Sequence, residues 1–105
     1  MLKINFTKMC GLVPVIIQEI NTKQVLMLGF MNQAAWQKTR ITKKVCFYSR
    51  TRKKLWTKGE TSGNYLLVKK IYLDCDNDTL LILVKLAGQS VCHTGQVSCF
   101  YQKFN

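Results

Sequence analysis

The chain has 105 residues, a formal net charge of +11 and five cysteines. This length fits one domain, residues 1–105, and a core of that size gains from oligomerisation because small domains bury little apolar surface. No apolar run is long enough to cross a membrane, and no secretory leader is present, so we expect a cytoplasmic location. Cysteines stay reduced there, and an odd number argues against a disulfide framework. Cys10 and Cys46, among apolar neighbours, are predicted core residues.

The excess of basic residues predicts an anionic partner. Nucleic acid and a phosphorylated small molecule are both candidates. The lysines and arginines are scattered along the chain, with local pairs at residues 43–44, 53–54 and 69–70. A nucleic-acid surface more typically collects them in one stripe, so this pattern is only a weak match to it.

The predicted elements are mostly strands. Residues 12–20 and 24–30 are predicted strands around a turn at 21–23, which makes a hairpin. Asn32 is a suitable N-cap for a helix over residues 33–39, which Trp36 would pack on the sheet. Further strands are predicted at 44–50, 65–73 and 79–87 and, from a weaker alternation, at 98–104, with a short extended piece at 55–58. The predicted class is α+β, with a mainly antiparallel sheet and one clear helix, and residues 1–10 receive no element.

An acidic stretch lies between two of these strands. Asp74, Asp76 and Asp78 are three of the five acidic residues in the chain. Alternate residues of an extended chain share a face, so the three carboxylates would point one way and Cys75 the other. Like charges repel one another, and a hard cation such as Mg²⁺ relieves the repulsion because it favours carboxylate oxygens.

Two other interpretations apply to this stretch. It begins like the calcium loop of an EF-hand, but the positions of the required Gly and Glu hold Thr79 and Lys85, which excludes that motif. The other interpretation is a polar turn between strands, since Asp and Asn favour turns. The nearby cysteines favour metal binding over a simple turn.

Cys92 and Cys99 flank a short loop that contains a glycine, and with Cys75 they offer three thiolates to a softer metal such as zinc. Three protein ligands leave one position for water, which is the pattern of catalytic zinc sites, whereas structural sites have four. His93 is the only histidine of the chain. Its position leaves two roles open, a fourth ligand or a general base.

Residues 59–64 form a second candidate site. The two glycines of this segment allow its backbone to approach a ligand closely, and its hydroxyls and successive amides can bind an anion. Arg50, Arg52 and Lys58 are near in sequence, so the segment is a candidate phosphate site. It matches no Walker or Rossmann pattern, and an ordinary surface loop is the alternative.

Taken together, these segments resemble the phosphoribosyl-AMP cyclohydrolase family of histidine biosynthesis. The resemblance is carried by residues 27–32, 47–52, 55–64, 74–78 and 92–100, in the family's order over nearly the full chain. There are two departures. Gly29 stands where the family leads us to expect alanine, and the chain is unusually rich in lysine.

The resemblance implies a hydrolase that acts on a cyclic amidine. The implied reaction is the hydrolytic opening of the adenine ring of 1-(5-phosphoribosyl)-AMP at the N1–C6 bond, with zinc-bound hydroxide attacking C6. The implied assembly is an intertwined homodimer with sites at the interface, in which Cys75 of one chain joins Cys92 and Cys99 of the other around zinc. His93 would move the proton as the catalytic residue.

The resemblance also implies the remaining contacts. Mg²⁺ would be held by Asp74, Asp76 and Asp78. The phosphorylated nucleotide would be bound by Arg50, Arg52, Trp56, Lys58, Gly59, Glu60, Thr61, Ser62, Gly63 and Asn64. We expect no nucleic-acid or membrane partner. Since the chain ends at Asn105, we also expect no fused domain for pyrophosphate release.

The alternative function is a small basic zinc-binding module for nucleic acid. It would use Cys75, Cys92, Cys99 and His93 as a closed structural site. It leaves the three aspartates unexplained, and their charges would repel a phosphate backbone.

Overall fold

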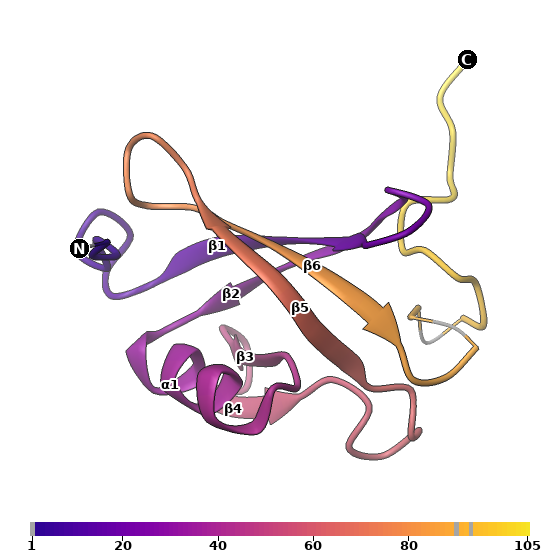
Figure 1. Ribbon diagram of the computed structural model, residues 1–105, viewed down its shortest axis with the longest axis horizontal. Helices are drawn as coiled ribbons and strands as arrows, with labels where there is room; N and C mark the ends of the chain where they lie inside the picture. The colour runs from indigo at the N-terminus through magenta and orange to yellow at the C-terminus, as the bar shows by residue number, and fades with distance from the viewer. Residues whose placement is uncertain (1, 90, 93) are drawn as a thin grey trace.

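The computed structural model describes residues 2–89, 91–92 and 94–105 (Figure 1). A four-stranded sheet in the order β2-β1-β6-β5 forms the main layer. Its strands are β1 (Val13–Glu19), β2 (Val25–Met31), β5 (Leu66–Leu73) and β6 (Leu80–Leu86). Helix α1 (Gln33–Thr42) follows β2 and leads to a two-stranded sheet of β3 (Cys46–Ser49) and β4 (Lys54–Thr57). The predicted α+β class with one clear helix is confirmed for the part of the chain that is described.

The sheet is mainly antiparallel, as predicted. The pairs β1–β2, β3–β4 and β5–β6 are all antiparallel. The exception is β1–β6, which is parallel from Val15 beside Leu80 to Glu19 beside Val84. This pair arises because the chain passes through α1, β3, β4 and β5 before β6 returns to the free edge of β1.

The core lies between the four-stranded sheet and the layer of α1, β3 and β4. The predicted strand at 12–20 is observed as β1, and its alternate residues Val13, Val15 and Ile17 are fully buried. Phe47 on β3 is also buried, and its ring lies 5.2 Å from that of Trp56 on β4. Packing of these side chains therefore fixes the small sheet against the large one.

Helix α1 begins where the sequence predicts. The side chain of Asn32 accepts a hydrogen bond from the N–H of Ala35 at 2.8 Å, which caps the first turn. The helix continues to Thr42, three residues beyond the prediction, and ends at Lys43, whose φ of 63° is left-handed. The buried Thr39 hydroxyl accepts from the N–H of Cys46 at 2.9 Å and so joins the helix to β3.

Three further predictions can be compared with the structure. The predicted strand at 98–104 is wrong, because this segment forms no ladder with β2: the Cys99 N–H donates to the Leu26 carbonyl at 2.7 Å, and the Ser98 hydroxyl lies within hydrogen-bonding distance of the Val25 and Leu26 carbonyls at 2.8 and 3.3 Å. Cys46 is buried as predicted, whereas Cys10 is exposed, because it lies in a tight turn with φ 53°. Among the described residues, no helix has the length and apolar content needed to cross a bilayer.

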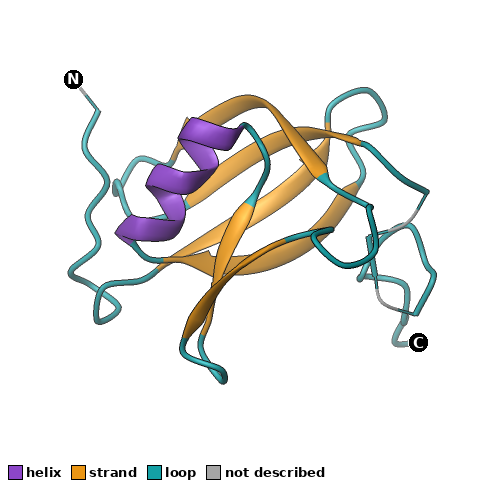
Figure 2. Cartoon of the chain, turned by 90° about the horizontal axis from the view of Figure 1, so that it is seen from below, coloured by secondary structure: helices purple, strands orange, loops and turns teal. Residues whose placement is uncertain are grey.

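The two ends of the chain lie at opposite ends of the molecule (Figures 1 and 2). The N-terminal segment runs beside the turn between β5 and β6, where Asn5 N–H donates to the Asn77 carbonyl at 2.7 Å. The loop after β6 and the C-terminal segment lie at the other end of β6 (Figure 1). The fold therefore separates the aspartate turn from the cysteine loop by the length of β6.

Gly29 on β2 gives space to the ring of Phe47. A Cβ built on Gly29 would lie 2.5 Å from Cδ1 of that ring, and Phe47 is only 1% exposed. Gly29→Ala is therefore expected to overpack the core and to lower the free energy of unfolding by about 1–3 kcal/mol. The measurement is the urea midpoint at unchanged m value. Because the two residues touch, the alanine should cost less in a Phe47→Leu background, and strictly additive costs would contradict the contact.

Candidate active site

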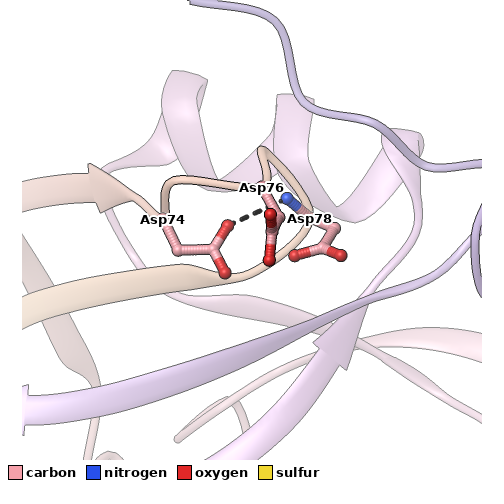
Figure 3. Close-up of side chains that lie close together, drawn as sticks. All are labelled: Asp74, Asp76 and Asp78. Carbon is pink, nitrogen blue, oxygen red and sulfur yellow. Dashed lines mark hydrogen bonds between the residues drawn. The ribbon is translucent and has the colours of Figure 1, made fainter.

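The three aspartates lie in the turn between β5 and β6 (Figure 3). The chain is not extended here as predicted: it turns, with Asn77 at φ 61°, which agrees with the polar-turn interpretation. The carboxylates nevertheless converge, since one oxygen from each of Asp74, Asp76 and Asp78 lies within 4.8 Å of the others. Among the residues that the structure describes, this is the one group of three acidic, cysteine or histidine side chains close enough to share an ion. Its hard oxygen ligands suit Mg²⁺.

Asp74 builds the turn that carries it. Its Oδ1 accepts the backbone N–H of Asp78 at 3.0 Å and that of Thr79 at 3.2 Å. Its carbonyl accepts from the N–H of Asn77 at 3.0 Å. One aspartate thus holds the loop in the shape that brings the other two carboxylates beside it.

The N-terminal segment supplies a residue that sequence reasoning missed. Lys8 Nζ donates to Asp78 Oδ2 at 3.1 Å, and this bond raises the pKa of Lys8 and lowers that of Asp78. The contact joins residues 70 positions apart in the chain. No local pattern marks one lysine among sixteen basic residues as the partner of the aspartates.

Cys92 and Cys99 come together at the other end of β6. Gly95 N–H donates to the Cys92 carbonyl at 3.0 Å and closes the loop between them. The Thr94 hydroxyl donates to Cys92 Sγ at 3.0 Å and is the main cause of a lowered pKa for the Cys92 thiol. Burial, with a smaller effect of the neighbouring Cys92, raises the pKa of the Cys99 thiol. The two predicted ligands are therefore neighbours.

The third predicted ligand does not lie beside this pair within one chain. Cys75 is exposed in the turn between β5 and β6, whereas Cys92 and Cys99 belong to the segment after β6, which lies at the other end of that strand (Figure 1). His93, predicted as the catalytic residue, lies outside the described residues.

A cavity of about 410 Å³ lies over the predicted phosphate segment. Its lining consists of Ser49, Arg52, Trp56, Thr57, Lys58, Gly59, Glu60, Thr61 and Ser62. Seven of these were predicted to bind substrate. Ser49 and Thr57 were missed, although each is adjacent to a residue that the basic and glycine-rich motifs had already indicated. The cavity thus combines two cationic side chains with hydroxyls and one carboxylate.

The remaining three predicted binding residues lie outside this lining. The guanidinium of Arg50 lies over the ring of Phe30, 3.9 Å from its centroid. Asn64 packs on Gly88, where an added Cβ would lie 1.8 Å from Asn64 Oδ1. Gly63 N–H donates to the carbonyl of Gly59 at 2.7 Å and so bends the loop.

Two residues give the cavity its form and its surroundings. Gly59 has φ 94°, and a Cβ there would lie 2.5 Å from the backbone of Asn64, so the loop requires glycine at this position. Lys58 lines the cavity. Its charge lowers the pKa of both thiols, by less than the Thr94 hydrogen bond lowers that of Cys92 and by less than burial raises that of Cys99. One cation of the cavity thus acts electrostatically on both thiols.

Comparison with known proteins bears on this arrangement. Residues 27–101 match the family described as phosphoribosyl-AMP cyclohydrolase. The chain belongs to this family. The resemblance found in the sequence is thereby confirmed, and the family is one of hydrolases that act on a cyclic amidine.

Curated relatives agree with the family match. A "Histidine biosynthesis bifunctional protein HisIE" of Pasteurella multocida is 60% identical over 101 residues, which cover 96% of this chain and 50% of that protein. Proteins of the same name from Haemophilus influenzae and Staphylococcus aureus (strain N315) are 60% and 61% identical, with 95% and 93% of this chain covered and 45% of each relative. The chain spans about half the length of the curated relatives it matches.

Proposed function

We propose that this chain opens the adenine ring of 1-(5-phosphoribosyl)-AMP by hydrolysis of the N1–C6 bond, a step of histidine biosynthesis. Family membership supports the reaction. The observation that carries the assignment is the cavity lined by Arg52 and Lys58, because the charge of Lys58 also lowers the pKa of the Cys92 and Cys99 thiols. A substrate with two phosphates and a reactive ring needs anion-binding groups next to a water-activating centre. The nucleic-acid alternative gives the aspartates no role.

The cavity suits a phosphorylated nucleotide. Arg52 and Lys58 offer charged donors, which make the stronger hydrogen bonds to phosphate oxygens. Thr61 and Ser62 add hydroxyl donors, and the Glu60 carboxylate is an acceptor for ribose hydroxyls. Substrate is thus held by its phosphates and sugar while its ring extends toward the thiols.

Zinc fits the cysteine residues only if two chains contribute. Cys92 and Cys99 are adjacent, but β6 separates them from Cys75 of the same chain, and seven residues of strand span roughly 20 Å. A two-fold homodimer supplies the missing thiolate twice, since each chain then gives Cys75 to the pair of its partner. These three cysteines would hold zinc with one position left for water, and zinc bound there would supply a Lewis acid that lowers the pKa of that water. His93, next to Cys92 in sequence, would carry the proton.

The same exchange brings in the aspartates. Cys75 lies between Asp74 and Asp76, so the chain that donates Cys75 also places its aspartate turn beside the partner's thiol pair. The three carboxylate oxygens form a hard site that fits Mg²⁺, which commonly shares its coordination with substrate phosphates. Each complete site would therefore combine the aspartate turn of one chain with the cavity and thiol pair of the other.

Arg52→Met tests the role of the cavity. Losing a charged donor to phosphate costs about 1.5–3 kcal/mol, so KM is expected to rise by roughly tenfold to a hundredfold while kcat changes much less. Arg40→Met is the matched control, because Arg40 lies over the Trp36 ring on α1, 5.1 Å from its centroid, and outside this cavity. Equal KM values for the two variants would show that the cavity does not bind substrate.

A further inference from the structure

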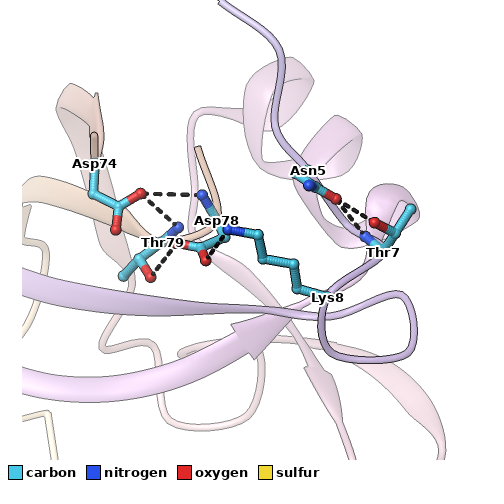
Figure 4. Close-up of polar contacts among 6 residues, drawn as sticks. All are labelled: Asn5, Thr7, Lys8, Asp74, Asp78 and Thr79. Atoms are coloured by element: carbon cyan, nitrogen blue, oxygen red, sulfur yellow. Dashed lines mark hydrogen bonds and ion pairs between the residues drawn. The ribbon is translucent and has the colours of Figure 1, made fainter. Parts of the chain in front are cut away.

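The N-terminal segment places the side chain of Lys8 against the aspartate turn (Figure 4). Asn5 N–H donates to the Asn77 carbonyl at 2.7 Å, which fastens the segment to the turn by its backbone. The side chain of Asn5 then accepts from the N–H of Thr7 at 2.9 Å and also from the Thr7 hydroxyl. This local bend precedes Lys8, whose Nζ lies 3.1 Å from Asp78 Oδ2.

The oxygens of Asp78 are already engaged in this arrangement. Oδ2 accepts from Lys8, and Oδ1 accepts from the Thr79 hydroxyl at 3.3 Å (Figure 4). On Asp74, Oδ1 accepts the two backbone N–H groups that hold the turn. Each carboxylate oxygen can accept two bonds, so Asp78 could still bind a metal while Lys8 stays, but the ammonium would then lie close to a divalent cation and repel it.

We propose that Lys8 is a tethered cation that competes with divalent metal at the aspartate site and thereby sets the metal affinity of that site. The inference rests on the proposed Mg²⁺ role of Asp74, Asp76 and Asp78. Without metal, the ammonium offsets part of the repulsion among three carboxylates. With metal bound, the divalent ion does so more fully, and Lys8 moves into solvent.

The tether makes this competition effective. The backbone bond between Asn5 and Asn77 does not involve the ammonium, so the segment stays docked when Lys8 leaves. A displaced group held nearby has a high effective concentration and returns when the metal dissociates. Lys8 also precedes residues 27–101, the part matched by the family. The proposed control of metal affinity by Lys8 thus comes from a residue outside the matched region.

The test is Mg²⁺ binding to the full chain, measured by calorimetry at constant ionic strength. Removing one positive charge beside a bound divalent ion is expected to tighten Mg²⁺ binding about fivefold in Lys8→Met. Lys8→Arg retains a competing cation and should bind within about twofold of the unchanged chain. Lys3→Met is the matched control, because it removes the same charge from the same segment. Lys3 is exposed, and among the described residues the ion pair with the aspartates is made by Lys8. The affinity of Lys3→Met should also stay within about twofold.

A second readout follows the ammonium itself. Acylation of each lysine by an amine-reactive ester, read by mass spectrometry, should speed up at Lys8 when Mg²⁺ is added and stay constant at Lys3. If Mg²⁺ binds equally well to the unchanged chain and to Lys8→Met, or if Lys8 reactivity does not respond to bound Mg²⁺, the competition is disproved while the metal site stands. If no variant binds Mg²⁺, the metal site and the competition both fail.

Discussion

A mixture of Cys75→Ser and Cys92→Ser protein is expected to regain activity, although each variant alone is expected to be inactive. The reason is geometric: the turn that carries Cys75 and the segment that carries Cys92 lie at opposite ends of β6, so the proposed site takes the two cysteines from different chains (Figure 1). In a mixed dimer, one site joins the intact Cys75 of one chain to the intact Cys92 and Cys99 of the other. The second site of that dimer carries both lesions.

The recovered activity follows from the two-fold symmetry. Random reassortment of equal amounts makes half of the dimers mixed, and each has one intact site of two, so about a quarter of the unmodified activity should return. Mixing Cys92→Ser with Cys99→Ser is the matched control. Each proposed site takes Cys92 and Cys99 from the same chain, and here every chain lacks one of the two, so no intact site can form. A Cys75→Ser and Cys92→Ser mixture as inactive as its parents, with mixed dimers shown by native mass spectrometry, would exclude the shared site.

His93→Ala is expected to lower kcat by about a hundredfold or more, as for the loss of a general base, while zinc content stays near normal. Three cysteine ligands leave the fourth position of zinc open to water. We therefore expect His93 to transfer a proton of that water and not to bind the metal. Zinc per chain is measured by atomic absorption alongside kcat.

The metal content separates the two roles that the sequence left open for His93. Cys99→Ser serves as the reference for a lost ligand, and its zinc content should fall sharply. A comparable fall in His93→Ala would make His93 a fourth ligand of a closed site, and the proposed general base would have to be sought elsewhere.

The strands and the helix could be predicted because their signals are local. The β-rich run at 12–20 predicts a strand, in which Val13, Val15 and Ile17 prove to be buried, and Asn32 belongs to the residue types that cap helices. The predicted strand at 98–104 failed for the opposite reason. A strand needs a partner strand with which to form a ladder of hydrogen bonds. The sequence of this segment does not reveal that it is joined to β2 through Ser98 and Cys99 without such a ladder.

In the candidate site, too, contacts between residues near in sequence could be predicted and contacts between distant residues could not. The convergence of Asp74, Asp76 and Asp78 was predicted from an extended chain, and it occurs because close spacing also brings side chains together across a turn. Distant contacts were not predictable. Lys8 meets Asp78 only through the path of the folded N-terminal segment, and the position of Arg50 depends on the ring of Phe30.

Turnover of 1-(5-phosphoribosyl)-AMP by the purified chain, before and after removal of zinc, tests whether this chain is a zinc-dependent cyclohydrolase. We expect turnover in the zinc-loaded protein, its loss on treatment with a chelator, and its recovery when zinc is added back. Zinc should also be lost as the pH falls, since thiolate ligands must be deprotonated to bind it. Absence of turnover in protein loaded with zinc and supplied with Mg²⁺, or undiminished turnover in protein shown to be free of zinc, would contradict the account.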